Sequence, residues 1–550
     1  MDDFTKKLTD YQKEAEERFA QKKAEESGLE YLNLLGYPID PEALALLDEK
    51  KARKANLVPL KKEFKYLEIA CLDPESKETK NILEEFEKKD YKIKLFVVSK
   101  KSLDYALGFY KFVHKPKGKI VGLIEIKEED IKNIDKKELS LEEVKEEIEQ
   151  FKKTKIGILA EIIFAGGILL DASDIHLEPK ENEAILRYRL DGLLYEAAAL
   201  DLAYYHKLLN RIKLLAGMKL NIKDAPQDGR FTIKFKGIDI EIRTSVVPSE
   251  YGEMIVLRIL NPKAINLTIK DLGFRDDHLK IVKREISRPN GLILNTGPTG
   301  SGKTTTLYTF LRHKQNPTIK IITIEDPIEY RLEGIDQTQI DRAAGYTFAS
   351  GLRSLLRHDP DVILVGEIRD KETAEIAMQS SLTGHLVFST LHTNDAVGAV
   401  PRLIEMGVNP SIVASALSMS IAQRLVRRLC PKCTEFKKPP KEFLKALEKV
   451  YKKLPEETLS SLPKIEEIKI GYPKDCKECQ QGYKGRIGVF ELFVVDEEIE
   501  KLINQKPTHA QLFELAVKKG MTTMQEDALI KIALGITSIE EAERVLGKLY

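Results

Sequence analysis

The sequence predicts a multi-domain α/β protein with a parallel β-sheet at its centre, covered by helices on both faces. The 550 residues of the chain are enough for about three or four domains. Between about residues 272 and 401, apolar strand-like segments alternate with helix-forming ones, which is typical of parallel sheets. The alternating segments are 291–295, 304–314, 320–324, 347–357, 362–365, 371–382 and 385–390.

A glycine-rich segment directly follows the first of these strands. It reads Gly297-Pro298-Thr299-Gly300-Ser301-Gly302-Lys303-Thr304. A strand before it and a helix after it are the context that a phosphate-binding loop requires, and a chance glycine-rich turn needs neither. Backbone N–H groups are expected to surround phosphate oxygens at the positive end of the helix. Lys303 would reach the terminal phosphates, and the Thr304 hydroxyl would ligate magnesium.

Acidic residues follow two other strands of this module. Glu325 and Asp326 come after strand 321–324, and Glu367 comes after strand 362–365 and one glycine. Ligands bind at the carboxyl ends of strands in such sheets, and a carboxylate there can hold a magnesium-bound water or activate the attacking water. Carboxylates also cap helices at such positions, so either segment alone supports both interpretations. Together with the loop they favour hydrolysis.

Two histidines, His385 and His392, flank the next strand. A single histidine is more often structural. Two histidines beside a nucleotide site could sense the γ-phosphate or bridge to a neighbouring subunit.

The preceding segment, from about residue 155 to 260, is unusually rich in arginine. It contains strand-like runs at 184–190, 230–235, 239–245 and 254–260, with a helix at 203–216. Its arginines are Arg187, Arg189, Arg211, Arg230, Arg243 and Arg258. Such residues are commonly solvated charges or weak ion pairs, but guanidinium also matches phosphate oxygens. Sequence spacing does not decide between these interpretations.

Two cysteine pairs in the last region predict a metal site. Cys430 and Cys433, with Cys476 and Cys479, can supply a tetrahedral sulfur set for one structural zinc ion; redox cysteines are the alternative. The residues between the pairs, 434–475, are expected to form a surface helical excursion, and the chain beyond Gly488 is expected to be helical.

Composition limits the compartment and the partners. Lysine and arginine (88) nearly balance aspartate and glutamate (87), so net charge recruits neither nucleic acid nor an acidic membrane. The longest apolar stretch, 156–170, is too short to span a bilayer, and the charged N-terminus has no secretory signal. Paired cysteines suit a reducing compartment, so a cytoplasmic location is expected.

Several segments of the chain, in one order, resemble a known family. They are 172–176, 226–230, 324–329, 352–353, 359–361, 366–370, 383–385, 389–393, 423–425, both cysteine pairs and 482–486. With them, the chain from about Asp171 to its end resembles the secretion and pilus ATPases of the GspE/PilB type. These are hexameric motors of type II secretion and type IV pilus assembly.

Composition and the resemblance together predict six parts. They are a charged N-terminal helix (1–27), an α+β module for partner docking (28–126), a charged linker (127–154), a PAS-like domain (155–262), a RecA-like P-loop ATPase core (263–401) and a zinc-stapled C-terminal region (402–550). Helices at 41–52 and 79–88 and strands at 66–70 and 92–98 support the α+β module.

The resemblance also implies roles for the site residues. Glu367 would polarise the attacking water, because the preceding residue is Gly366 instead of the family's usual aspartate. Glu325 and Asp326 match the family's aspartate box, and His385 and His392 match its histidine box. Arg243 and Arg258 match two arginines that the family brings toward the phosphates when the domains close. ATP, Mg²⁺ and Zn²⁺ are the implied cofactors.

The implied partners are five further copies of the chain, an inner-membrane platform protein and an assembly protein, with peripheral membrane association and no direct contact with nucleic acid. The N-terminal module shows Leu34-Leu35-Gly36 where the family's cyclic di-GMP motif begins with Arg-Leu-Gly, so docking on the assembly protein is expected instead. A nucleic-acid-translocating motor would need a basic stripe with stacking aromatics, and a scaffold without turnover would lack Glu367. Pilus, secretion and DNA-uptake machines share such a motor.

Overall fold

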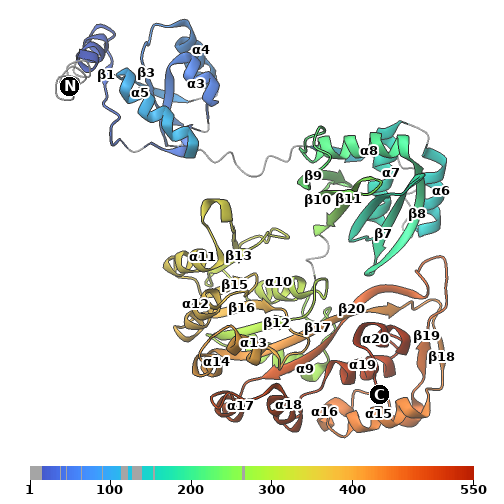
Figure 1. The fold of residues 1–550 in the computed structure, drawn as a ribbon. Coiled ribbons are helices and arrows are strands. Elements are labelled where there is room, and N and C mark those ends of the chain that lie inside the picture. The colour runs from blue at the N-terminus through green and yellow to red at the C-terminus, as the bar shows by residue number, and fades with distance from the viewer. Residues whose placement is uncertain are drawn as a thin grey trace. The chain divides into compact units, whose positions relative to one another are not determined.

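The computed structural model describes residues 15–550 apart from 38, 45, 64, 89–90, 113–121, 127–138, 153–154 and 263–266. The chain forms two compact units, residues 1–119 and 120–550 (Figure 1). Residues 15–26 are helical, and the rest of the predicted N-terminal helix lies outside the described residues. Within the described part, no helix is long and apolar enough to cross a membrane.

The N-terminal unit contains a four-stranded sheet in the order β1-β4-β3-β2. Its strands are β1 (Glu30–Tyr31), β2 (Leu57–Glu63), β3 (Tyr66–Cys71) and β4 (Lys92–Val97), and its helices are α2 (Pro41–Leu44), α3 (Glu49–Ala55), α4 (Lys77–Glu87), α5 (Lys100–Leu107) and η1 (Gly108–Phe112). The single helix predicted at 41–52 is wrong. Asp48 caps a new helix there by accepting a hydrogen bond from the Lys50 N–H.

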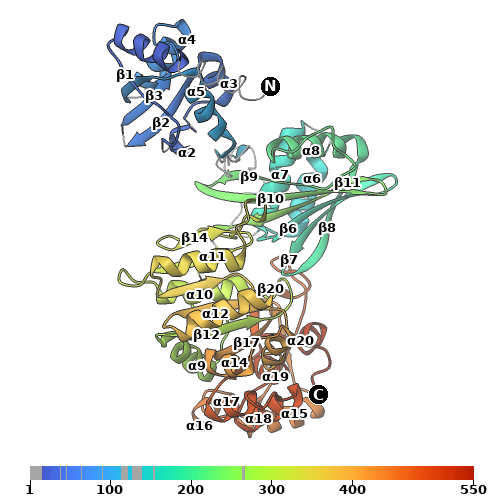
Figure 2. The same cartoon turned by 60° about the vertical axis from the view of Figure 1, so that its left-hand side comes forward.

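The second unit begins with a seven-stranded sheet in the order β5-β9-β10-β11-β6-β7-β8, called here the arginine-bearing sheet. Its strands are β5 (Leu123–Ile126), β6 (Asp174–Pro179), β7 (Glu183–Leu190), β8 (Leu193–Asp201), β9 (Gln227–Phe235), β10 (Ile238–Ser249) and β11 (Gly252–Leu260). The helices α6 (Leu141–Phe151), α7 (Ile156–Leu169) and α8 (Leu202–Leu215) cover one face, as Figure 2 shows.

Alternation along the strands gives this sheet two different faces. Leu186 and Tyr188 of β7 are fully buried against the helices, whereas the intervening Arg187 and Arg189 lie on the open face. Two expected boundaries are corrected. Strand β5 pairs in parallel with β9, so residues 123–126 belong to this sheet and not to the N-terminal module. The predicted linker 127–154 contains α6, which packs into the core of this domain through Val144 and Ile148.

A second seven-stranded sheet forms the nucleotide core, in the order β14-β13-β15-β16-β12-β17-β20. It consists of β12 (Gly291–Thr296), β13 (Ile321–Glu325), β14 (Asp336–Gln339), β15 (Val362–Val365), β16 (Leu386–Leu391), β17 (Leu417–Leu429) and β20 (Tyr483–Val494). All neighbours are parallel except β17 and β20. The predicted parallel sheet is confirmed.

Helices cover both faces of this sheet (Figure 1). They are α9 (Asp276–Ser287), α10 (Lys303–Lys314), η4 (Arg342–Ala344), α11 (Phe348–Leu355), η5 (Leu356–His358), α12 (Lys371–Leu382), α13 (Ala399–Glu405) and α14 (Pro410–Ala416). Leu292 and Leu294 of β12 pack toward α11 to α14, and Ile293 packs toward α9 and α10. The strand is apolar at consecutive positions because both of its faces are buried.

The C-terminal region packs against the β20 edge. Its elements are β18 (Glu435–Lys437), α15 (Lys441–Tyr451), α16 (Glu456–Leu459), η6 (Ile465–Glu467), β19 (Ile470–Tyr472), α17 (Glu497–Ile503), α18 (His509–Lys518), α19 (Met524–Ala533) and α20 (Ile539–Leu546). The predicted surface excursion at 434–475 is wrong, because Phe443 and Leu447 of α15 are fully buried in the main core. The chain just beyond Gly488 is also not helical, since it completes β20.

Candidate functional site

The predicted phosphate loop joins β12 to α10 in the expected geometry. Gly302 has a φ of 88° and stands immediately before the first helical residue, Lys303. A Cβ atom on Gly297 would lie 2.7 Å from the Gln423 carbonyl oxygen, and one on Gly302 would lie 2.8 Å from Gln423 Nε2. Glycine is therefore required at both positions, and the positive end of α10 opens into the loop.

The loop's polar side chains fit a bound phosphate. Lys303 Nζ donates to the carbonyl oxygens of Gly297 at 2.8 Å and Pro298 at 2.9 Å. Burial lowers the pKa of Lys303, and the neighbouring Arg424 lowers it further. The buried Ser301 hydroxyl has no hydrogen-bond partner among the described residues. A lysine and an unpaired hydroxyl held inside a glycine loop match the needs of a nucleotide phosphate.

The predicted acids line one cavity beside this loop. The cavity has a volume of about 150 Å³, and its lining includes Thr304, Glu325, Asp326, Glu329 and Glu367. These side chains come from the start of α10 and from the carboxyl ends of β13 and β15, at one edge of the parallel sheet. All five offer oxygen atoms, which are the ligands that Mg²⁺ prefers.

Glu325 and Asp326 differ in environment. The Glu325 carboxylate is buried and accepts hydrogen bonds from Tyr308, from Thr323 at 2.5 Å and from Gln337 at 3.2 Å. Burial raises its pKa, while these donors oppose the rise. Asp326 is more exposed and pairs with Arg342 at 3.2 Å. Glu325 is thus fixed by the core, and Asp326 is the freer of the two carboxylates.

Glu367 lies between two groups that hold it. Its Oε1 is 2.7 Å from Arg369 Nη2 and its Oε2 is 3.7 Å from His392 Nε2. The structure therefore brings His392 to Glu367. His385 stands at the other end of β16, where its Nδ1 lies 2.8 Å from the Ser380 carbonyl oxygen. The expectation that both histidines lie beside this nucleotide site is wrong for His385, since the two ends of a strand lie at opposite edges of the sheet.

The two predicted arginines lie directly opposite each other on β10 and β11. Arg243 Nη2 donates to the carbonyl oxygen of Ile328, in the segment that carries the cavity acids. Arg258 Nε donates to Asp174 Oδ1 at 3.1 Å. Other arginines of this sheet form ion pairs within it, such as Arg187 with Glu178. Arg243 alone of the two already contacts the nucleotide core.

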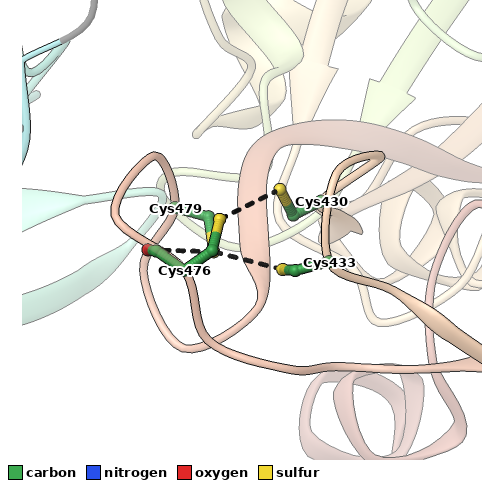
Figure 3. A group of neighbouring side chains, drawn as sticks. All are labelled: Cys430, Cys433, Cys476 and Cys479. Carbon is green, nitrogen blue, oxygen red and sulfur yellow. Dashed lines mark hydrogen bonds between the residues drawn. The ribbon is translucent and has the colours of Figure 1, made fainter.

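The four paired cysteines converge between the end of β17 and the start of β20, as Figure 3 shows. All four sulfur atoms lie within 4.8 Å of one another. The Sγ–Sγ distances are 3.9 Å for Cys430–Cys476, 3.6 Å for Cys433–Cys479 and 3.4 Å for Cys476–Cys479. A tetrahedron with Zn–S bonds of about 2.3 Å needs Sγ–Sγ distances of about 3.8 Å. The set therefore fits one zinc ion.

Several residues of the site were given no role from the sequence. Glu329 lines the cavity, Tyr308 holds Glu325, and Gln423 Oε1 accepts from Asn295 and Thr306 beneath the loop, at 2.9 and 2.8 Å. The Arg424 guanidinium donates to the Asn394 carbonyl oxygen at 3.1 Å. Gln423 and Arg424 come from β17, far from the loop in sequence, and no local pattern places them beside it.

Comparison with known proteins gives consistent matches. A family model described as "Type II/IV secretion system protein" matches residues 149–544, and one described as "MshEN domain" matches residues 27–110. "Type II secretion system protein HxcR" of Pseudomonas aeruginosa is 44% identical over 376 residues, covering 68% of this chain and 74% of the relative. "Type IV pilus assembly ATPase PilB" of Myxococcus xanthus is 35% identical over 524 residues, covering 94% and 88%.

A solved structure also shares the fold. The ATPase DotB of Legionella pneumophila superposes with a TM-score of 0.51 at 21% identity, covering 70% of this chain and 95% of that one. The α/β fold predicted from the sequence is confirmed, as is the resemblance to secretion and pilus ATPases.

Proposed function

Because the chain belongs to the type II/IV secretion system protein family and is an ATPase, we propose that it is a motor that couples ATP hydrolysis to pilin or pseudopilin assembly. The machine would be a type IV pilus or a type II secretion system. One observation carries this proposal: the phosphate loop, the acid-lined cavity and Arg243 meet within a single unit of the chain.

Each group in the site has a distinct task. Lys303 and the loop N–H groups would bind the β- and γ-phosphates of ATP, and Thr304 with Asp326 would hold Mg²⁺. Magnesium, when bound, neutralises charge on the phosphates. Glu367, oriented by Arg369, would accept a proton from the attacking water. His392 lies close enough to Glu367 to respond to that proton transfer.

Arg243 and Arg258 would complete the site from the neighbouring sheet. Guanidinium groups that stabilise a transferring phosphoryl group are worth about 10³ to 10⁵ in rate in GTPases. Arg243 contacts the core through one backbone carbonyl, and a charged phosphate oxygen would be a stronger acceptor for the guanidinium. ATP would draw the arginine-bearing sheet onto the core, and hydrolysis would release it.

We further propose that six copies form a ring, so that closing and opening around the ring turns a platform protein. The unit formed by residues 1–119 would dock on an inner-membrane assembly protein. These partners imply a cytoplasmic motor at the inner face of the membrane, attached only peripherally. The four cysteines would bind a structural zinc ion, since their fit leaves no position open for a substrate.

Steady-state ATP hydrolysis by the full chain tests the enzymatic part of the proposal. Glu367→Gln removes the proton acceptor and keeps the shape, so hydrolysis should fall by about 10² to 10⁴-fold. Glu333→Gln is the matched control, because Glu333 is exposed and is absent from the cavity lining. Equal rates for wild type and Glu367→Gln would remove Glu367 from the mechanism.

Isolation of intact complexes from membranes tests whether the chain works in a pilus or secretion machine. Pilin-like and platform proteins should co-purify with the tagged chain. Recovery of nucleic acid in their place, with ATPase activity that DNA stimulates, would contradict the assembly role.

A further inference from the structure

The open face of the arginine-bearing sheet carries a row of charged side chains whose order follows from strand register. Arg243 on β10 is opposite Arg258 on β11, Arg258 is opposite Asp174 on β6, and Asp174 is opposite Arg189 on β7. Directly opposed residues point to the same face with Cβ atoms about 4.5–5.5 Å apart. Asp174 therefore stands between two arginines.

Asp174 contacts each of the two arginines at its Nε atom, through a different carboxylate oxygen. Its Oδ1 accepts from Arg258 Nε at 3.1 Å, and its Oδ2 lies 3.3 Å from Arg189 Nε. The Ser173 hydroxyl donates to Oδ2 at 2.9 Å. Asp174 is only 5% exposed. A carboxylate that is almost fully buried requires such charged and hydrogen-bonding partners. Asp174 therefore restricts the positions of both guanidinium groups.

The two arginines differ at their terminal nitrogens. Arg189 Nη1 donates to the Gly192 carbonyl oxygen at 3.3 Å, and its Nη2 lies 3.4 Å from His176 Nε2. The Arg258 side chain is 54% exposed. Its Nη atoms make neither a hydrogen bond nor an ion pair with any residue that the structure describes. Only Arg258 therefore has a free pair of donors.

We propose that Asp174 is the positioning residue that holds Arg258 by Nε and presents its two Nη groups to a phosphate of ATP. The guanidinium is a rigid planar fork, so an acceptor at Nε fixes its direction while leaving the Nη pair for a bidentate contact with phosphate oxygens. The inference rests on the proposed function, in which Arg258 reaches the nucleotide.

Arg243 shows a looser form of the same arrangement. Its Nε lies 3.6 Å from Glu241 Oε1, and its Nη2 donates to the core at Ile328. Glu241 is far more exposed than Asp174, at 36% against 8% for the side chains. Asp174 thus restrains Arg258 more strongly than Glu241 restrains Arg243, although Arg258 makes no hydrogen bond to the described residues of the core.

A double-mutant cycle on the full chain tests the inference. Wild type, Asp174→Asn, Arg258→Ala and the double variant are compared for kcat, KM and thermal unfolding. Asp174→Asn keeps the side-chain shape but loses the charge, so kcat/KM should fall about tenfold, a typical cost of misorientation. In the double variant the loss should equal that of Arg258→Ala alone, because Asp174 acts through Arg258. If the loss in the double variant instead equals the product of the two single-variant losses, the inference is overturned.

Two further variants separate positioning from stability. Glu178→Gln changes a neighbouring acid of β6 that pairs with Arg187, and it should leave kcat/KM near the wild-type value. Asp174→Glu keeps the buried charge but shifts the carboxylate by one methylene, and misplacement of about 1 Å can cost 10²-fold. A wild-type rate for Asp174→Glu would contradict the inference, and so would a rate loss in Glu178→Gln equal to that in Asp174→Asn.

The outcomes also separate this inference from the proposed function. If Arg258→Ala hydrolyses ATP at the wild-type rate, the role of Arg258 fails and the inference fails with it. If Arg258→Ala is severely impaired while Asp174→Asn is not, only the inference fails.

Discussion

The nucleotide core and the arginine-bearing sheet present their functional side chains in different ways. In the core, the loop and the acids lie where parallel strands end, at one edge of the sheet. In the arginine-bearing sheet, Arg243, Arg258 and Asp174 lie across three strands on one open face. The topology of the first sheet fixes its site, whereas the second depends on strand register. In the proposed cycle, the core would bind the phosphates and the arginine-bearing sheet would bring its charges to them.

The largest loss of ATP hydrolysis is expected from removing the lysine of the phosphate loop. Lys303→Ala should lower ATP hydrolysis by more than about 10³-fold, because in the proposed site the lysine would contact the phosphates directly. Nucleotide binding and steady-state hydrolysis measure this, with Lys314→Ala at the far end of α10 as the control. Normal binding by Lys303→Ala would show that the loop is not the nucleotide site.

Removal of the charges on the second sheet should be the next largest effect. Arg243→Ala and Arg258→Ala should each lower kcat by about 10³-fold, the lower end of the range for arginine fingers, because each would remove charge stabilisation of the transition state. Arg187→Ala is the matched control on the same face, because Arg187 pairs with Glu178. If Arg243→Ala and Arg258→Ala both hydrolyse ATP as fast as the control Arg187→Ala and the wild type, the catalytic charges lie entirely within the core.

Loss of the cysteine set should affect stability more than chemistry. A Cys430→Ser, Cys476→Ser double variant should lose its zinc and several kcal/mol of folding free energy, because metal binding is coupled to folding. Metal analysis and thermal unfolding measure this. Cys71→Ser, which changes the remaining cysteine of the chain, should keep full zinc content. Unchanged zinc in the double variant would exclude this set as the metal site.

The smallest effect concerns a buried acid of the core. Burial raises the pKa of Glu491 to about 7, so the folded state binds a proton that the unfolded state has already released at neutral pH. The contribution of this proton to the free energy of unfolding is complete below the pKa of Glu491 in the unfolded state, and it is lost as the pH rises toward 7. Glu491→Gln should therefore be stabilised relative to wild type at pH 8 by up to about 3 kcal/mol, and much less at pH 4.5.

Thermal unfolding at the two pH values measures this difference. Glu497→Gln, an exposed change on α17, should show none. A Glu491→Gln effect that is equal at both pH values would mean that folding does not raise the pKa of the Glu491 carboxyl.

The difference between the two sheets also explains which features could be predicted from the sequence. The core was predictable because buried parallel strands are apolar throughout, and because the loop and the acids stand at fixed offsets from those strands. Register is not visible in a sequence, so the opposition of Arg258 and Asp174 was not predicted. Neither was the pairing of β5 with β9, which lies about 100 residues further along the chain. His385 was misplaced because its proximity to the strand said nothing about which end it occupies.

The most direct test of the two-part site is a comparison of affinities for a non-hydrolysable ATP analogue and for ADP. In wild type the analogue should bind more tightly, because in the proposed site Arg243 and Arg258 would close on the γ-phosphate. The Arg243→Ala, Arg258→Ala double variant should lose this preference and keep its affinity for ADP, which the loop alone binds. If the double variant still prefers the analogue as strongly as wild type does, the second half of the site is not the arginine-bearing sheet.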